Sequence, residues 1–294
     1  SYCKMHGGGI LNDLPGTSIS KSLFQYSSGI GLESASGSGV ITYCTAEYNQ
    51  FTGMQLGSRP IMNSKSDYNR GDGIVSTGML TNCSAEGNKR DGLTGGGVSG
   101  CIAASNRGIG IISSGAVTNS SANNNDGNGI NCSSGNVASC TAEDNGGFGL
   151  LISGGGTALG CAANRNGGGG IQTDGSTLSG CVVEGNTGEG ITGSGSSTIS
   201  GCDIVGNTGL AVSGVQSVTD CRIVSNGGGI SGASLIEQSY VVENTGAGVT
   251  GGAVSDCVIV GNVGDGAISV SSVDNSWITD NNGIGILGDY STSV

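Results

Sequence analysis

The sequence predicts an all-β solenoid in which short strands stack in parallel from one coil to the next. Glycine is unusually frequent, at 61 of 294 residues, whereas there are only 2 prolines and 4% aromatic residues. An asparagine returns every 18 to 21 residues along most of the chain. Inward and outward residue types alternate before each asparagine, which is the two-residue period of a β-strand. A repeat of this length predicts about 14 to 15 short coils of three short strands, each burying its apolar side against its neighbours.

The asparagine column defines the repeat. The phrase Asn-x-Gly-x-Gly-Ile, as in 186–191, recurs along the chain, and we place His6 and Tyr26 in the same column upstream. An inward amide at a sharp turn can bond the turn backbone and the asparagines above and below, so we expect an inward ladder. The two glycines let the backbone turn a corner without Cβ clashes. The column comprises Asn49, Asn69, Asn88, Asn106, Asn125, Asn145, Asn166, Asn186, Asn207, Asn226, Asn244, Asn262 and Asn281.

Three further inward columns belong to the strands. Five residues after the asparagine an aliphatic residue such as Ile74 or Ile191 recurs, and three before it a small or aliphatic residue such as Ala85 or Ile204. A third aliphatic column precedes the cysteines. Its members are Val98, Val137, Leu159, Leu178, Ile199, Val218 and Val254.

Nine of the 11 cysteines occupy one inward column, five residues before the asparagine. Neighbouring Cβ atoms would stand near the strand spacing of about 4.8 Å, which is wider than the ~3.8 Å that a disulfide prefers. We therefore predict a ladder of buried, reduced thiols, with Cys3 and Cys132 outside it. The nine are Cys44, Cys83, Cys101, Cys140, Cys161, Cys181, Cys202, Cys221 and Cys257.

Units of the form GCxVxxNxGxGI resemble the repeats of the right-handed parallel β-helix superfamily, the pectate-lyase-like group with a stacked asparagine ladder. The resemblance covers nearly the whole chain and implies a right-handed coil. No second domain interrupts the repeat, so we predict one repeat domain over 1–294, with less regular coils in 1–43 and regular coils in 44–288.

Composition excludes several classes of function. The net charge of −12 and a pI near 4.2 argue against nucleic acid and anionic membranes as partners. No apolar run approaches the ~20 residues that cross a bilayer, so we expect no membrane insertion. His6 is the only histidine, which leaves no basis for a Ser-His-Asp triad or a histidine-rich metal site. We expect an extracellular protein or one at a cell or virion surface.

Residues 44–93 hold the candidate site. Glu47, Asp67 and Glu86 lie two residues before their asparagines and should point outward. Asp72 and Asp91 lie three residues after theirs, in adjacent coils and so roughly 5 Å apart. Such a separation raises the pKa of one carboxyl group, recruits a cation or suits a retaining glycosidase pair. The same segment contains Tyr48 and Tyr68, which we expect to contact carbohydrate, and the basic residues Lys65, Arg70 and Arg90.

The superfamily resemblance adds a specific chemistry. Polysaccharide lyases of this superfamily use a Lys or Arg base, often with Ca²⁺ neutralising a uronate. The resemblance therefore implies Lys65, Arg70 or Arg90 as the base. It also implies that Glu47, Asp67 and Glu86 are the ligands of the cation. The alternative is that charges of both signs only solvate an outward face. No cofactor is required on either reading, although Ca²⁺ fits the first.

A different surface is predicted late in the chain. Tyr240, Val242, Val258, Val260 and Trp277 fall in consecutive coils and should all point outward. An exposed apolar stripe indicates a contact surface, either a subunit interface, a partner-domain contact or an aromatic sugar platform. Neither terminal sequence resembles a cap for a solenoid, so we expect end-stacking neighbours, a homo-oligomer or a longer parent chain.

These observations favour a non-catalytic structural or adhesive β-helix that mediates self-assembly or binds carbohydrate or another partner. Uniform short coils without long loops, low charge and a single histidine support this prediction. The alternative is a polysaccharide-degrading enzyme, a lyase or glycoside hydrolase, with its site on the outward face of residues 44–93.

Overall fold

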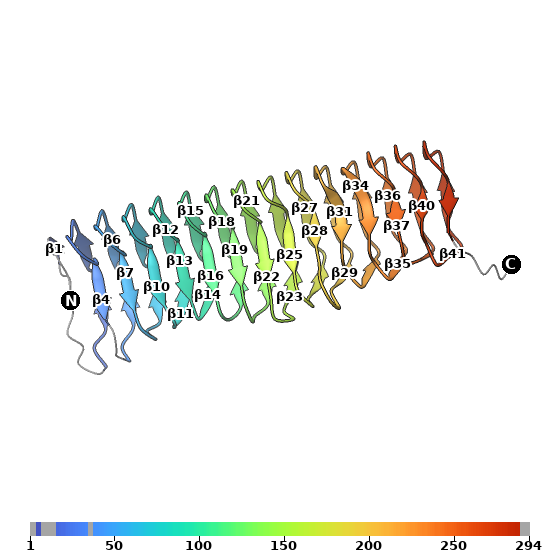
Figure 1. Ribbon diagram of the computed structural model, residues 1–294. Helices are drawn as coiled ribbons and strands as arrows, with labels where there is room; N and C mark the ends of the chain where they lie inside the picture. The colour runs from blue at the N-terminus through green and yellow to red at the C-terminus, as the bar shows by residue number, and fades with distance from the viewer. Residues whose placement is uncertain (1–3, 7–15, 35–37, 289–294) are drawn as a thin grey trace. The chain divides into compact units, whose positions relative to one another are not determined.

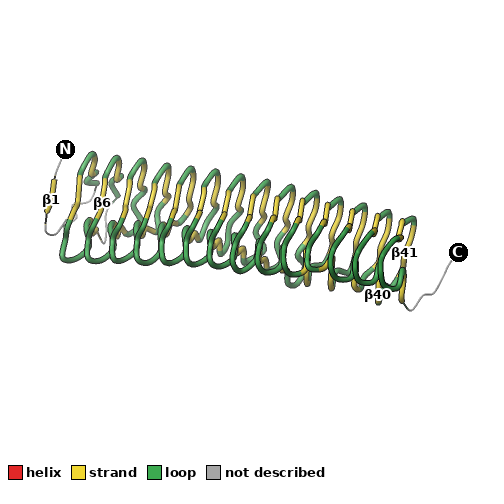
Figure 2. The backbone as a smooth tube through the Cα atoms, turned by 90° about the horizontal axis from the view of Figure 1, so that it is seen from above, coloured by secondary structure: helices red, strands yellow, loops and turns green. Residues whose placement is uncertain are grey.

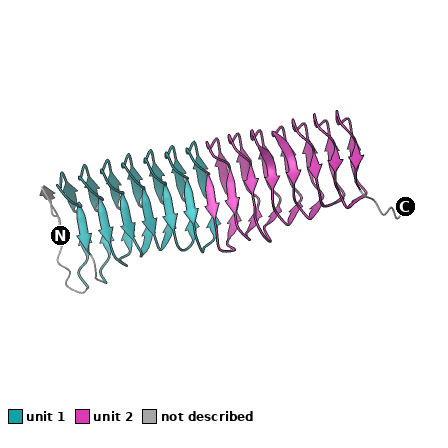
Figure 3. Ribbon diagram, viewed as in Figure 1, with its two compact units in different colours: residues 1–147 teal, residues 148–294 magenta. Residues whose placement is uncertain are grey.

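The computed structural model describes residues 4–6, 16–34 and 38–288, and it consists of short strands in parallel sheets (Figure 1). The chain divides into two compact units, Ser1–Gly147 and Phe148–Val294 (Figure 3). Each unit is a right-handed parallel β-helix, as the sequence predicts. In the described residues no helix is long and apolar enough to cross a membrane. Two expectations stay predictions: a single repeat domain over 1–294, and a change from less regular to regular coils at residue 44.

Unit 1 contains three sheets, which we call A, B and C. Sheet A is formed by β1 (Lys4–His6), β3 (Leu23–Gln25), β6 (Thr45–Glu47), β9 (Lys65–Asp67), β12 (Ser84–Glu86), β15 (Ile102–Ala104), β18 (Ser121–Asn123) and β21 (Thr141–Glu143). Sheet B is formed by β4 (Leu32–Ser34), β7 (Met54–Leu56), β10 (Ile74–Ser76), β13 (Leu93–Gly95), β16 (Ile111–Ser113) and β19 (Ile130–Cys132). Sheet C is formed by β2 (Ile19–Ser20), β5 (Ile41–Thr42), β8 (Ile61–Met62), β11 (Met79–Thr81), β14 (Gly97–Ser99), β17 (Val117–Thr118) and β20 (Val137–Ala138).

Unit 2 repeats this arrangement. Its sheet A is formed by β24 (Ala162–Asn164), β27 (Val182–Glu184), β30 (Asp203–Val205), β33 (Arg222–Val224), β36 (Tyr240–Val242), β39 (Val258–Val260) and β42 (Trp277–Thr279). Its sheet B is formed by β22 (Leu150–Ile152), β25 (Ile171–Thr173), β28 (Ile191–Thr192), β31 (Leu210–Ser213), β34 (Gly228–Ser231), β37 (Val249–Thr250), β40 (Ala267–Ile268) and β43 (Ile286–Leu287). Its sheet C is formed by β23 (Thr157–Leu159), β26 (Thr177–Ser179), β29 (Thr198–Ser200), β32 (Ser217–Thr219), β35 (Leu235–Glu237), β38 (Ala253–Ser255) and β41 (Ser272–Asp274).

Each coil contributes one strand to each sheet (Figure 2). Left-handed residues turn the chain on both sides of sheet A. One lies directly before the inward cysteine column, as at Tyr43 (φ 55°) and Asp220 (φ 53°). The other lies directly before the inward asparagine, as at Tyr48 (φ 58°) and Glu243 (φ 57°). This conformation costs little for Gly, Asn or Asp but more for other residues, so the neighbouring coils must hold it in place.

The core is built from the predicted inward columns. Ile191, Cys202 and Ile204 are at most 2% exposed, in agreement with the alternation read from the sequence. One member is wrong: Leu159 is exposed, and Ala158 takes the inward place opposite Leu178. The reason is spacing, because the other members lie three residues before the inward cysteine and Leu159 lies two before it. In a strand a shift of one residue changes the face.

The asparagine ladder is confirmed within each unit. The Asn186 amide donates to Oδ1 of Asn207 at 2.8 Å and to the Ala163 carbonyl at 2.9 Å. The backbone N–H of Asn186 donates to the same Asn207 oxygen at 3.0 Å. Each asparagine therefore pairs buried polar groups of its own turn and of neighbouring coils by hydrogen bonds. Buried backbone N–H and C=O groups require such partners.

Two upstream members of the column were misplaced by the sequence reading. Ser27, not Tyr26, occupies the place of the column in this coil, because its N–H donates to Asn49 Oδ1 at 2.9 Å. The inward aliphatic residue of this coil is the buried Leu32, which lies five residues after Ser27. The backbone of His6 pairs with Gln25, and Gln25 pairs with Glu47 in the next coil. Because Glu47 lies two residues before Asn49, His6 is two positions away from the asparagine column.

The cysteines of the ladder are buried free thiols, and Cys132 is a further buried free thiol on β19. Cys3 lies outside the described residues. Burial raises the pKa of the Cys44 and Cys257 thiols, although backbone hydrogen bonds oppose the effect. A protonated, buried thiol reacts slowly, because the thiolate is the nucleophile.

We therefore expect a Cys3→Ser variant to resist a water-soluble aromatic disulfide reagent while folded. In guanidinium, without reductant, all of its remaining thiols should react at once. A single cysteine that is labelled rapidly in the native protein, or thiols missing after denaturation, would contradict the reduced ladder. Counting thiols by absorbance is sufficient.

Candidate functional site

Three tyrosines form an exposed stack on unit 1. Tyr26, Tyr48 and Tyr68 each lie at the left-handed position that follows a sheet A strand, so successive coils bring them side by side. The ring centroids of Tyr26 and Tyr48 are 5.6 Å apart, and those of Tyr48 and Tyr68 are 5.5 Å apart, with interplanar angles of 10° and 12°. The three side chains remain 61%, 44% and 46% exposed. We call this set the tyrosine column.

The column presents ring edges and hydroxyls to solvent, because the faces of Tyr48 are covered by its two neighbours. At its far end Tyr68 covers Gly87, where an added Cβ would lie 2.6 Å from ring atoms of Tyr68. The Tyr68 hydroxyl donates to Glu86 Oε1 at 3.4 Å. The Glu86 carboxylate raises the pKa of Tyr68, so this phenol stays protonated and remains a donor.

Beside the column, Glu47, Asp67 and Glu86 lie in register on β6, β9 and β12. Asp67 does not project into solvent as the sequence predicts, because its side chain is fully buried. Its Oδ2 is 2.6 Å from Lys65 Nζ, and its Oδ1 accepts from the Glu86 N–H at 3.0 Å. Burial raises the pKa of Asp67, an effect that the Lys65 ammonium partly offsets.

The three carboxylates have different partners. Glu47 accepts a short hydrogen bond from the Gln25 amide, Asp67 pairs with Lys65, and Glu86 faces Tyr68. Among the residues that the structure describes, no three His, Cys, Asp or Glu side chains form a group able to hold a metal ion. A Ca²⁺ site at these three residues stays a prediction.

The second candidate pair, Asp72 and Asp91, bonds to the backbone. Asp72 Oδ1 accepts from the Asp91 N–H at 3.1 Å, and Asp91 Oδ1 accepts from the Ile109 N–H at 2.7 Å. In unit 2, Asp265 Oδ1 accepts from the Ile284 N–H at 2.6 Å in the same way. One oxygen of each carboxylate thus caps the next coil, a structural use that sequence spacing does not reveal.

The candidate bases are spread along the outer surface. Arg90 Nε lies 3.7 Å from Asp72 Oδ1, and Lys65 is held by Asp67. Arg70 is exposed, and its backbone N–H donates to the Asn49 carbonyl at 2.9 Å. The structure therefore brings together Lys65 with Asp67, and Arg90 with Asp72. Among the described residues, no candidate base is linked by a hydrogen bond or ion pair both to the Glu47, Asp67 and Glu86 set and to the Asp72 and Asp91 pair.

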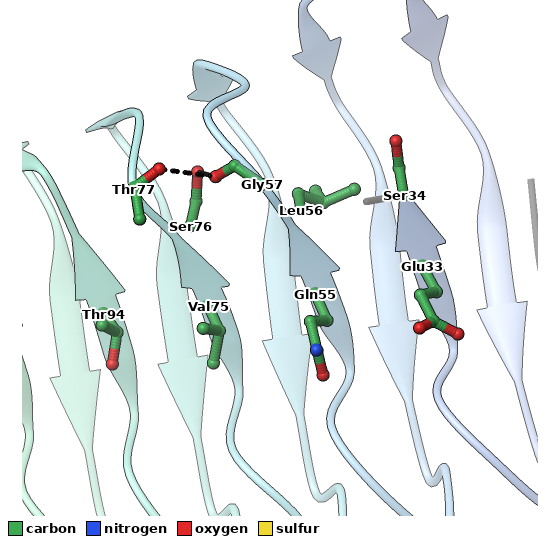
Figure 4. A pocket seen from close by; sticks show the side chains of 9 residues that line it. All are labelled: Glu33, Ser34, Gln55, Leu56, Gly57, Val75, Ser76, Thr77 and Thr94. Atoms are coloured by element: carbon green, nitrogen blue, oxygen red, sulfur yellow. Dashed lines mark hydrogen bonds between the residues drawn. The ribbon is translucent and has the colours of Figure 1, made fainter. Parts of the chain in front are cut away.

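A groove on sheet B was missed by sequence reasoning. It has a volume of about 290 Å³, near the lower end of ordinary ligand pockets. Glu33, Gln55, Val75 and Thr94 lie in a row along it on β4, β7, β10 and β13, and the Thr77 hydroxyl donates to the Gly57 carbonyl at 3.1 Å beside it (Figure 4). The sequence does contain a signal for this row. Gln55, Val75 and Thr94 all lie six residues after an asparagine of the ladder, at an outward position.

The apolar residues predicted late in the chain lie on the outer side of sheet A of unit 2. Tyr240 and Trp277 are 57% and 69% exposed, and Val242, Val258 and Val260 are half-buried. Tyr240, Val258 and Trp277 are in register on β36, β39 and β42, as are Val242 and Val260 on β36 and β39. The structure therefore assembles these five residues into one surface, but it does not show what covers them.

No family model matches the chain, and no curated protein matches it in sequence. Solved structures with a similar fold include the Agl-KA catalytic domain, with 11% identity and a TM-score of 0.43 over 85% of this chain and 62% of that one. A second is the A-module of mannuronan C-5 epimerase AlgE6 from Azotobacter vinelandii, with 13% identity and a TM-score of 0.42 over 99% and 91%. A third is the catalytic domain of a GH87 α-1,3-glucanase in complex with nigerose, with 11% identity and a TM-score of 0.49 over 99% and 63%.

The chain thus spans less than two thirds of the length of the Agl-KA and GH87 domains. A likeness at this level carries no argument about activity, since one fold hosts many functions. The function of this chain has to be argued from its own surface.

Proposed function

We propose that the protein is a non-catalytic, extracellular or surface-located β-helix that binds a glycan along the tyrosine column of unit 1. The observation that carries the proposal is the exposed stack of Tyr26, Tyr48 and Tyr68 at a regular spacing. It offers a row of phenol hydroxyls with the carboxylates of Glu47 and Glu86 beside it. A row of aligned donors and acceptors suits the repeated hydroxyls of an extended saccharide.

The class of glycan follows from charge. Glu47, Asp67 and Glu86 border the column, and the Lys65 ammonium on the same sheet is paired with Asp67. A uronate chain would face like charge there unless a cation such as Ca²⁺ bridged it. We therefore propose a neutral or amino-sugar glycan as the preferred ligand.

The test is a comparison of two matched tyrosine variants. Tyr48 and Tyr43 are both exposed and both left-handed in backbone, but only Tyr48 belongs to the column. After a glycan array identifies a ligand, Tyr48→Asn should weaken binding roughly tenfold, as expected for a central contact. Tyr43→Asn should leave the affinity within a factor of about two, since it is remote from the stack.

Titration calorimetry with and without Ca²⁺ gives the affinities. Absence of binding to every neutral, amino-sugar and uronate glycan would remove the proposal. Equal losses in the two variants would show that the column is not the site.

The second candidate function is polysaccharide cleavage on the same unit, favoured by Asp72 beside Arg90 with Asp91 in the next coil. It predicts reducing-end or unsaturated products from a bound glycan. Product formation that disappears in Asp72→Asn, while the variant keeps its thermal stability, would establish this function in place of the binding-only proposal.

A further inference from the structure

The outer side of sheet A changes character along unit 2. The column at the third strand position carries Asn164 and Glu184 on β24 and β27, and then valine on the following strands up to β39. β-propensity would favour valine equally in every coil, so it does not explain the change. We call the apolar surface formed by β36, β39 and β42 together with Val224 of β33 the valine strip. It consists of Val224, Val242, Val260, Tyr240, Val258 and Trp277. The exposed Arg222, in register with Tyr240, lies at its end on β33.

Acidic side chains border the valine strip on both sides. Two of the four left-handed positions before these strands hold the exposed Asp220 and Asp256. Two of the four after them hold the exposed Glu243 and Asp280. The other residues at these positions in the same coils are uncharged. The strip is thus an apolar band between two rows whose only charges are negative.

Positive charge is almost absent from this unit. Arg165 and Arg222 are its only basic residues, and Arg222 Nη1 already pairs with Asp203 Oδ1 at 2.6 Å. A second copy of the chain laid face to face would oppose acidic rows with acidic rows, which disfavours self-association through this face.

We infer that the valine strip is a docking surface for a basic amphipathic polypeptide, with an apolar centre that packs on the valines and Lys or Arg on both edges. Flat aliphatic side chains suit protein packing, in which sheets pack about 10 Å apart, better than they suit sugars, which use aromatic faces. Tyr240 and Trp277 are the residue types that anchor protein interfaces. The inference is independent of the glycan site, which lies on unit 1.

Trp277 provides the readout, because it is the single tryptophan of the chain and lies 69% exposed within the strip. The probe is a synthetic, tryptophan-free β-hairpin peptide with valines on one face and lysines along both edges. It is titrated into the full chain and should shift Trp277 emission to the blue as water is excluded. Hairpins with glutamate for lysine, or with serine for valine, should bind roughly tenfold more weakly or worse. About 1 M NaCl, where the Debye length is only about 3 Å, should weaken the lysine hairpin.

Two valine variants provide the protein controls. Val242→Asp places a charge at the centre of the strip and should abolish the shift, whereas Val182→Asp, at an exposed valine on β27 outside it, should not. Thermal unfolding by circular dichroism checks that both variants remain folded.

Three results would overturn the inference. The first is an equal response to all three hairpins, or none to the lysine hairpin. The second is tighter binding of a glucosamine oligosaccharide than of the peptide at the strip. The third is a dimer in analytical ultracentrifugation that is lost in Val242→Asp, which would make a second copy the occupant.

Discussion

Gly188→Ala should prevent unit 2 from folding stably. An added Cβ would overlap the carbonyl oxygen of Gly168 in the preceding coil, and that atom is backbone rather than a movable side chain. The next glycine of the motif, Gly190, has similar constraints, with the Ala211 carbonyl oxygen 2.6 Å and Ile204 Cγ2 2.7 Å from an added Cβ. Relief requires neighbouring coils to separate and their ladder hydrogen bonds to stretch, so we expect a loss of about 4 kcal/mol or more.

The matched control is Gly206→Ala. Gly206 has a φ of +65° but nothing within 4 Å of an added Cβ, so only backbone strain of about 1 to 2 kcal/mol should result. Urea unfolding followed by circular dichroism measures both. If Gly188→Ala were no more destabilising than Gly206→Ala, close contact between coils would not be the reason for glycine in the motif.

The repetitive part of the fold could be predicted from sequence because it depends on local period. Cys202, Ile204 and Ile191 face inward at fixed distances from an asparagine, and a two-residue alternation is enough to say so. Where the number of residues from the column position changes by one, the predicted facing of the side chain is wrong, as at Leu159 and Tyr26. The failure has a physical basis, since the face of a strand residue depends on its count from the turn.

The candidate site was less predictable because its contacts lie between coils. The carboxylates of Asp72 and Asp91 appear from sequence to be a free pair, but each is bonded to an amide about nineteen residues further on, a partner that carries no side-chain signature. Asp67 is fully buried, and its carboxylate is held by the Lys65 ammonium and the Glu86 N–H, which residue type alone does not indicate. The tyrosine column became visible only when the register placed Tyr26 beside Tyr48.

The chemistry of these surfaces is therefore best tested where the scaffold does not need the residue. Asp72 and Asp91 stabilise the coil and would confound a loss of activity with a loss of structure. Tyr48 and Val242 instead have outward side chains, exposed and half-buried respectively, and Tyr48 contacts its neighbours through ring stacking. Substitutions at these two residues separate binding from folding.

Asn186→Ala should be nearly as destabilising as Gly188→Ala, for a different reason. Asn186 is fully buried and accepts from the N–H and the amide of Asn166 at 2.8 and 3.0 Å, while its own amide serves Asn207 and Ala163. Alanine leaves the Asn166 N–H and the Ala163 carbonyl without these partners, and each unsatisfied buried group costs about 1 to 3 kcal/mol. The total should be about 4 kcal/mol, measured as a lower urea midpoint with an unchanged slope.

Two further variants separate hydrogen bonding from simple loss of an asparagine. Asn282→Ala, at an exposed neighbour of the ladder, should change stability by less than about 0.5 kcal/mol. Asn186→Asp keeps an acceptor for Asn166 but removes both donors and buries a carboxyl group, whose pKa burial should raise. A raised pKa in the folded state means that the ionised form is disfavoured there, so this variant should gain stability as the pH falls through that pKa. An Asn186→Ala variant no less stable than Asn282→Ala would show that the ladder hydrogen bonds do not stabilise the coil, and an Asn186→Asp variant whose stability does not change with pH would contradict the burial of this side chain.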